Sequence, residues 1–239
     1  MSGSVIIIDR CGDISITASE PGGISVLVEA LQSRDIEVRI FRDKEFIQTD
    51  LDCDCVFIAY PTVSFNDTEI TALHRYVNNG GGLFLIGEWG NTSNNTSILN
   101  TIADKYSVTF NPDRICDPQY FIRDGFQSKI YDVKVFNLRQ HPITRGVREF
   151  RIVAACSLNA PYDNVVAWAS KASFGDLDFD SEQDAYEAGQ YLPVMAAVEY
   201  GRGRVAFIGD LSFMSNQHIL NMNNGQLVIN VILYLMHRL

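Results

Sequence analysis

The segment FNDTEITALHRYVNNGGGLFLIGE, residues 65–88, decides how this chain folds. Asn66 is followed three residues later by Glu69, a capping-box pattern that predicts the start of a helix. Apolar residues at helical spacing continue the helix until Gly80, where an Asn-Gly pair is typical of a helix end. The apolar run at 82–87 then predicts a strand buried on both faces.

The flanking sequence repeats this alternation of strands and helices. Apolar runs at 4–9, 36–41 and 55–61 read as strands, and helices are expected at 23–34 and 95–106. Such an order favours a parallel sheet covered by helices. We therefore predict an α/β, flavodoxin-like fold with a mostly parallel sheet, helices on both faces and added antiparallel strands.

The second half of the chain is less regular. Short strand-like runs between 107 and 160 suggest antiparallel additions, and residues 192–210 read as a hairpin turning at Gly201 to Gly203. The last helix, 224–238, is apolar almost all round, so it is either deeply packed or part of an interface. The simplest organisation is a single domain over 1–239, with an acidic loop insertion at 171–190.

Composition excludes several classes of function. The formal net charge is −10 and no basic patch is evident, so nucleic acid is not an expected partner. No apolar run approaches a membrane span, and the first residues lack the pattern of a secretory signal. An odd number of irregularly spaced cysteines indicates reduced thiols rather than a disulfide framework. We expect a soluble, cytoplasmic protein without direct membrane insertion.

Three segments together resemble a known superfamily. Residues 65–88 look like the signature of class I glutamine-amidotransferase-like domains, and HPITRG (141–146) resembles a segment of several non-amidotransferase branches. The segment LPVMAAVEYGRGRVAFIGDLSFMSNQHILNMNNGQLVINVILYL (192–235) resembles the gliding-motility/intraflagellar-transport branch. That branch includes auxiliary proteins of ABC transporters and the N-terminal domain of an intraflagellar-transport complex B subunit.

The resemblance implies a fold but not the superfamily's reaction. Its enzymes use a Cys at a Gly-x-Cys-x-Gly elbow and a late His-x-Glu pair, and the elbow exposes the nucleophile beside backbone N–H groups. Here Gly87-Glu88-Trp89-Gly90 stands at the elbow and Gly209-Asp210-Leu211-Ser212 at the late position. The Cys-His-Glu triad is absent, so enzymatic activity is left open and not favoured, because chemistry depends on the site rather than the fold.

Ligands of open parallel sheets bind beyond the carboxyl ends of the strands. The residues expected at that edge are Asp9, Arg10, Thr62, Glu88, Trp89, Asp210, Ser212 and Asn216. The carboxylates could perform acid/base chemistry or hold a cation, or they could only cap helices and loops. Trp89 could stack on a sugar or cover the sheet edge, and His218 is the histidine placed to join this group.

The insertion also contains a calcium-loop spacing. Asp176, Asp178, Asp180 and Glu187 match positions 1, 3, 5 and 12 of a D-x-D-x-D-x6-E loop. Ser181 replaces the glycine that the turn of such a loop requires, so a solvated acidic loop without any cofactor competes with calcium binding.

Three functions remain open at this point. The favoured one is a non-catalytic binding or assembly module of a transport-type complex, with protein partners or self-association. The first alternative is binding of a carbohydrate or other small molecule by Glu88, Trp89 and Asp210. The second is a hydrolase that uses the carboxylates, which requires a particular separation between them.

Overall fold

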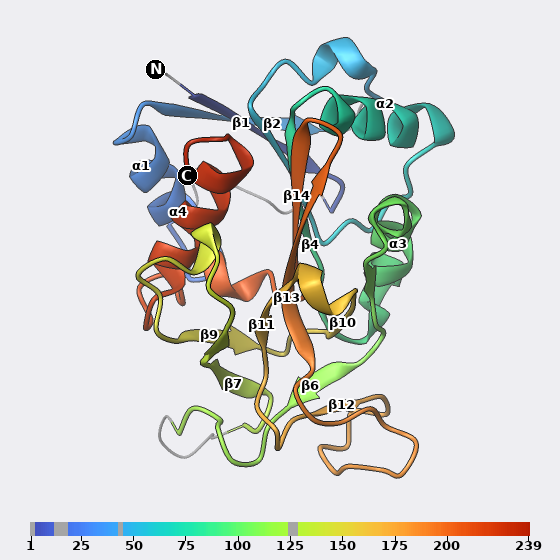
Figure 1. Ribbon diagram of the computed structural model, residues 1–239, viewed down its shortest axis with the longest axis vertical. Coiled ribbons are helices and arrows are strands. Elements are labelled where there is room, and N and C mark those ends of the chain that lie inside the picture. The colour runs from blue at the N-terminus through green and yellow to red at the C-terminus, as the bar shows by residue number, and fades with distance from the viewer. Residues whose placement is uncertain (1–2, 12–18, 43–44, 124–128) are drawn as a thin grey trace.

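A computed structural model describes residues 3–11, 19–42, 45–123 and 129–239 (Figure 1). An eight-stranded sheet forms its centre. In order across the sheet the strands are β2 (Ile36–Arg42), β1 (Gly3–Asp9), β3 (Cys55–Ala59), β4 (Gly82–Ile86), β14 (Gly203–Ile208), β13 (Pro193–Tyr200), β11 (Val165–Trp168) and β8 (Asn137–Leu138). The strands from β2 to β14 are parallel, and β13, β11 and β8 continue the sheet in antiparallel pairs. This confirms the predicted flavodoxin-like α/β fold.

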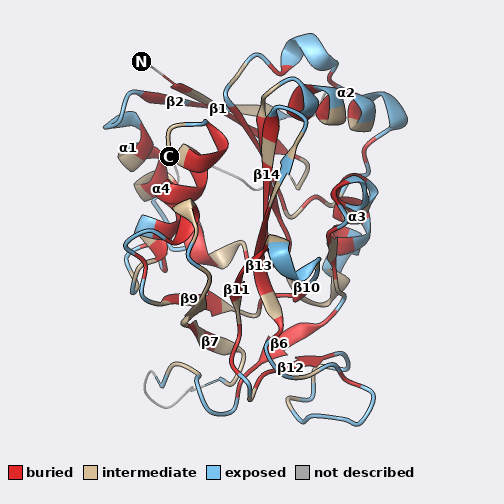
Figure 2. Cartoon of the chain, viewed as in Figure 1, coloured by how far each residue is buried: buried red, intermediate tan, exposed pale blue. Residues whose placement is uncertain are grey.

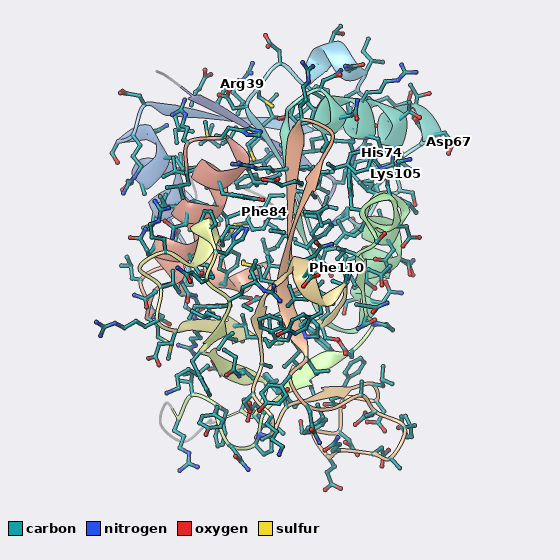
Figure 3. All side chains as sticks on the ribbon, in the orientation of Figure 1. Arg39, Asp67, His74, Phe84, Lys105 and Phe110 are labelled. Atoms are coloured by element: carbon teal, nitrogen blue, oxygen red, sulfur yellow. The ribbon has the colours of Figure 1, made fainter. Side chains whose placement is uncertain are left out.

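Two layers of helices cover the sheet. Helices α1 (Ser25–Gln32) and α4 (Asn224–Leu235) pack on one face, and α2 (Asp67–Asn78) and α3 (Asn95–Ala103) pack on the other (Figure 1). Figure 2 shows the central strands as buried, and every residue of β3 and β4 is buried because both faces are covered. Phe84 belongs to the apolar cluster on the α1 and α4 side, whereas Phe110 belongs to the cluster on the α2 and α3 side (Figure 3).

Helix α2 starts at the predicted capping box. The Asn66 side chain accepts a hydrogen bond from the Glu69 backbone N–H at 3.0 Å, and the Glu69 carboxylate accepts one from the Asn66 N–H at 3.0 Å. These bonds satisfy backbone donors that the first turn leaves without helical partners. The prediction made from residues 65–88 is therefore confirmed in atomic detail.

Three small antiparallel sheets make up the irregular part. They pair β10 (Leu158–Asn159) with β5 (Thr109–Phe110), β12 (Phe174–Asp176) with β6 (Arg114–Cys116), and β7 (Asp132–Val135) with β9 (Phe150–Val153). The predicted loop at 171–190 therefore begins with a strand, β12, and only the residues after it form an irregular loop. The antiparallel additions predicted between 107 and 160 are present, whereas β12 was not predicted, because apolar alternation in so short a strand is too brief to distinguish it from a loop.

The last helix is deeply packed, which decides between the two alternatives left open by its sequence. Most of α4 is buried, including Asn230, whose side-chain amide donates to the carbonyls of Ile143 and Arg145 at 2.9 and 2.8 Å. These bonds satisfy a polar group that would otherwise be costly to bury. Within the described ranges, no helix is long and apolar enough to cross a membrane.

We expect Asn66→Ala to lower the free energy of unfolding by about 1 kcal/mol, because it removes the side-chain acceptor at the start of α2. Thr71→Ala, at an exposed position of the same helix, is the matched control and should leave stability unchanged or slightly raised. Urea unfolding followed by circular dichroism measures both. Equal stability of the Asn66 variant and the unaltered protein would contradict the role of this cap.

Candidate functional site

The register of β4 and β14 brings two acidic residues together. Ile86 lies opposite Ile208 in the parallel pair, and the backbone N–H of Gly87 donates to the Ile208 carbonyl at 2.8 Å. Glu88 and Asp210 follow at the same end of the two strands. This is the carboxyl edge where parallel sheets place their ligand sites.

Asp210 has a structural role in this pair. Its side chain is fully buried and accepts hydrogen bonds from the backbone N–H groups of Val153 at 2.9 Å and Ser212 at 2.6 Å. These bonds join the end of β9 to the short helix η7 (Ser212–Met214). Burial nevertheless raises the pKa of Asp210 to about 7, because the protein interior disfavours the charged carboxylate.

Glu88, the residue that the sequence resemblance places at a nucleophile elbow, has an ordinary extended conformation. Its φ and ψ are −150° and 159°, and its carboxylate accepts from the following N–H, that of Trp89, at 3.1 Å. The left-handed backbone comes later, at Gly90 and Asn91, with φ of 67° and 50°. A nucleophile elbow requires the strained turn at the nucleophile itself, so this junction lacks the geometry as well as the residue.

The pKa of Glu88 lies well above its usual range. Burial is the largest cause, and repulsion from Asp210 adds to it, whereas the N–H groups of Trp89 and Leu211 partly oppose the shift. Two carboxyl groups that are shielded from solvent and repel each other do not both ionise readily. We therefore describe them as a pair in which Glu88 holds a proton more firmly than an exposed glutamate.

Trp89 covers the sheet edge rather than facing the same space as Glu88. Its ring packs edge to face against Phe179, with centroids 5.0 Å apart, and the Arg114 guanidinium lies 5.7 Å from its centroid. Arg114 is buried and forms an ion pair with Asp176 at 2.5 Å. The start of the insertion is thus fastened over the loop that follows β4.

Three further predicted residues hold the opposite part of the same edge. Asp9 is buried at the end of β1 and accepts from the Arg42 guanidinium at 2.9 Å. Arg10 pairs with Glu69 at the start of α2, and the Thr62 hydroxyl donates to the Arg10 carbonyl at 3.0 Å. These contacts connect β1 to β2 and α2, and the residues do not converge with Glu88 on one ligand.

Asn216 also has a structural partner. Its side-chain oxygen accepts from the Val26 N–H at 3.0 Å, and its amide donates to the Glu20 carbonyl at 3.0 Å. The bond to Val26 satisfies a backbone donor in the first turn of α1, which is the role of a cap supplied from a distant loop.

A cavity of about 330 Å³ opens beside Glu88 at the carboxyl ends of the strands. Two of the predicted site residues, Glu88 and Ser212, line it, and His218 lines it as the sequence suggested. The remaining lining residues are Ile7, Cys11, Gly22, Gly23, Ile24, Phe57, Ala59, Tyr60, Leu211, Met214, Ser215 and Gln217. Tyr60 and Cys11 could have been found because they follow β3 and β1 directly, whereas Gln217 lies on a loop whose path the sequence does not reveal.

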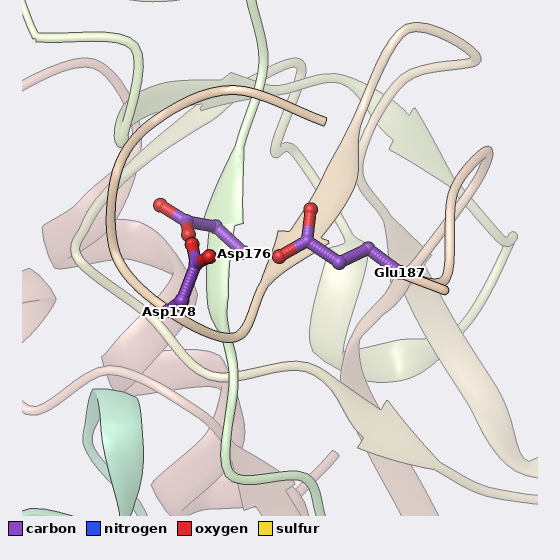
Figure 4. A group of neighbouring side chains, drawn as sticks. All are labelled: Asp176, Asp178 and Glu187. Atoms are coloured by element: carbon purple, nitrogen blue, oxygen red, sulfur yellow. The ribbon is translucent and has the colours of Figure 1, made fainter. Parts of the chain in front are cut away.

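The calcium-loop residues converge in part. Oxygen atoms of Asp176, Asp178 and Glu187 lie within 4.8 Å of one another, and Asp180 is outside this group (Figure 4). Asp176 already faces the Arg114 guanidinium, and Glu187 accepts from the backbone N–H groups of Leu177 and Asp184 at 2.7 and 3.0 Å. The carboxylates therefore have partners within the chain, and calcium binding stays a prediction.

The fold is flavodoxin-like, and the junction after β4 carries Glu88 and Trp89 rather than a Cys or Ser. A family model described as "Domain of unknown function (DUF4350)" matches residues 17–232, so the chain belongs to that family. No curated protein sequence matches it significantly.

Solved structures share the fold at low identity. The mmIFT52 N-terminal domain superimposes with a TM-score of 0.77 at 16% identity, with 97% of each chain covered. A cytoplasmic protein from Salmonella typhimurium LT2 gives 0.61 at 17% identity, covering 97% of this chain and 99% of that one. A putative ThuA-like protein from Bacteroides uniformis gives 0.58 at 13% identity, covering 98% and 91%. These similarities establish the fold and leave function to the site.

We expect Glu88→Gln to stabilise the protein relative to the unaltered chain, and increasingly so as pH rises from 5 to 8. A carboxyl with a raised folded-state pKa contributes its full stability below its unfolded value of about 4.5 and loses it as pH rises through the folded pKa. Glutamine cannot ionise, so the variant avoids this loss. Urea unfolding at several pH values measures the difference. Glu37→Gln, at an exposed position of β2, should show no comparable trend, and a trend equal in both variants would contradict the assignment.

We expect millimolar calcium chloride to leave the melting temperature unchanged, because the Arg114 guanidinium already neutralises Asp176. Differential scanning fluorimetry with and without a chelator tests this. A rise in melting temperature that Asp178→Asn abolishes would instead establish a calcium site in the insertion.

Proposed function

We propose that this chain is a non-catalytic binding module of a multi-protein, transport-type assembly. The observation that carries the proposal is the junction after β4, where Glu88 is extended and Trp89 is covered by Phe179 of the insertion. A fold that keeps its core but has no Cys or Ser at this junction is suited to binding rather than turnover. The resemblance to the intraflagellar-transport branch and the fold likeness to the mmIFT52 N-terminal domain favour the same reading.

The partner surface in this proposal is the acidic lobe, defined here as residues 177–187. Leu177 and Tyr186 are 40% and 63% exposed, and Tyr191 beside the lobe is 50% exposed. Exposed aromatic residues grouped in this way are typical of protein interfaces. They make the lobe a better binding surface than the helices, whose apolar sides face the sheet.

The charge of the lobe indicates the kind of partner. Its exposed acidic residues are Asp178, Asp180, Glu182 and Asp184, and the sequence contains no Lys or Arg between 172 and 201. A surface of one sign attracts a complementary surface and accelerates encounter. The expected partner is a protein with a basic surface that can also accommodate an aromatic side chain, or a second copy of this chain that presents basic residues from elsewhere.

The lobe is held in shape before any partner arrives. Asp176 anchors its beginning through Arg114 and also accepts from the Phe179 N–H at 2.6 Å. Glu187 anchors its end through the N–H groups of Leu177 and Asp184. A loop that is already ordered loses less conformational entropy on binding than a free one.

The test is purification of the tagged protein from its native cells, with mass spectrometry and with light scattering on the isolated chain. We expect a stoichiometric protein partner or a defined self-assembly. The double variant Asp180→Lys/Glu182→Lys and the variant Tyr186→Ser should each weaken the measured affinity about tenfold or more, as loss of an interface anchor does. Rising salt should weaken the native interaction as well.

Two controls separate the lobe from the rest of the molecule. Glu37→Lys places the same charge change on β2, and Glu88→Gln alters the strand edge; both should bind as the unaltered chain does. A monodisperse protein without a partner would contradict the proposal. So would an interaction that survives the lobe variants and is lost in Glu88→Gln.

A further inference from the structure

The cavity beside Glu88 has an apolar interior of the size that takes a small organic molecule. Its volume is about 330 Å³, and sheet residues Ile7, Phe57 and Ala59 line it together with Ile24 and Met214. All five side chains are buried, so this apolar lining lies inside the protein. Cavities of a few hundred Å³ with apolar walls and few polar groups are the usual form of small-molecule sites.

The polar lining has one group that can carry a negative charge at neutral pH and no Lys or Arg among the described lining residues. That group is Glu88. Two buried carboxylates elsewhere in the chain have a guanidinium partner: Asp9 has Arg42 and Asp176 has Arg114. In the described part of the chain, no ion pair is found for Glu88.

The residues around Glu88 do not compensate for the lack of a cationic partner among the described residues. The oxygens of the neighbouring Asp210 accept hydrogen bonds from the N–H groups of Val153 and Ser212, and Asp210 also repels the charged form of Glu88. A positive charge in the cavity would oppose both the burial cost and this repulsion, and would allow the carboxyl to ionise. An anionic ligand would meet the opposite situation, because none of the described residues that line the cavity is a Lys or Arg that could receive it.

Backbone strain marks the same place. Tyr60 lines the cavity immediately after β3 with a φ of 43°, a left-handed conformation that a tyrosine seldom adopts. Such conformations cost free energy and are retained mainly where a side chain must be held at a site. This observation is independent of the charges and points to the same cavity.

We propose that this cavity binds a small organic amine, with its ammonium group on the Glu88 carboxylate and its hydrocarbon part against Ile7, Phe57 and Met214. The site is separate from the acidic lobe, so the inference does not depend on the proposed partner binding. A metal ion is not favoured as the occupant. Among the described residues the one group of ligand atoms at metal distance is the lobe cluster of Asp176, Asp178 and Glu187.

The pH dependence follows from the groups that face Glu88. Ionisation of Glu88 is required to pair with the ammonium, so amine affinity should rise as pH rises through the raised pKa of this carboxyl, with release of a proton on binding. The titratable groups around Glu88 or along the same cavity are Asp210, Cys156, Cys11, Tyr60 and His218. Burial lowers the pKa of His218 and raises that of Cys156, which favours the neutral form of both, so the trend is set by the carboxyl pair.

Calorimetry and thermal shift on the full chain test the proposal with matched probes. The probes are phenethylamine, cyclohexylmethylamine and isopentylamine, each beside the alcohol of the same skeleton, with phenylacetate as the anion. We expect at least one amine to bind, about tenfold or more tightly than its alcohol, and phenylacetate not to bind. One favourable ion pair in a partly desolvated site is sufficient for that difference.

Variants distinguish the ion pair from simple apolar filling. Glu88→Gln should lose about tenfold or more in amine affinity while binding the alcohols as before, and Glu37→Gln should behave as the unaltered chain. Calorimetry in two buffers of different ionisation enthalpy reports the released proton. Amines that bind no better than alcohols, an unchanged amine affinity in Glu88→Gln, or no binding by any amine would each overturn the proposal.

Discussion

The pairing of β4 with β14 is the constraint on which the rest of this molecule depends. Both strands are covered on both faces, and their parallel register places Ile86 opposite Ile208. The chain must therefore leave the sheet at Gly87 and Gly209, side by side. A side chain on Gly209 would start 1.9 Å from the Cys156 carbonyl, so the close packing here permits only glycine. Glu88 and Asp210 therefore follow at the same end of neighbouring strands, where their carboxyl groups repel each other.

These two carboxyl groups have different environments and hence different roles. Asp210 is surrounded by backbone donors and organises the connection between β9 and η7. Glu88 accepts from the Trp89 N–H and faces a cavity. The same pair thus combines a structural carboxylate with one that remains available to a ligand. This division explains how an edge without a Cys or Ser after β4 can still present defined chemistry.

The insertion at 171–190 covers the strand edge on the side of Trp89. Arg114 connects the insertion to the loop after β4, since it pairs with Asp176 and lies over the rings of Trp89 and Phe179. A buried ion pair of this kind contributes to a specific arrangement more dependably than to net stability. Its effect here is to separate two surfaces: the cavity beside Glu88 and the exposed acidic lobe. A binding module can use both without interference.

The sequence by itself determined the architecture wherever local signals were strong. The capping box at Asn66, the buried run before Gly87 and the hairpin turn at Gly201 each act within a few residues, so the parallel sheet and its helices could be predicted. The sequence also showed that position 88 carries a glutamate rather than a nucleophilic Cys or Ser.

Only the tertiary structure decided which residues share a site. Trp89 follows Glu88 directly yet packs against Phe179, whereas His218 lies far along the chain and lines the same cavity. The short strands β6 and β12 were also beyond prediction, because their pairing comes from distant segments rather than from their own pattern. Local hydrogen bonds and the periodicity of burial depend on residues close together in the sequence, so they can be predicted from it. The direction of a side chain at the end of a strand depends instead on loops that only the folded chain brings into contact.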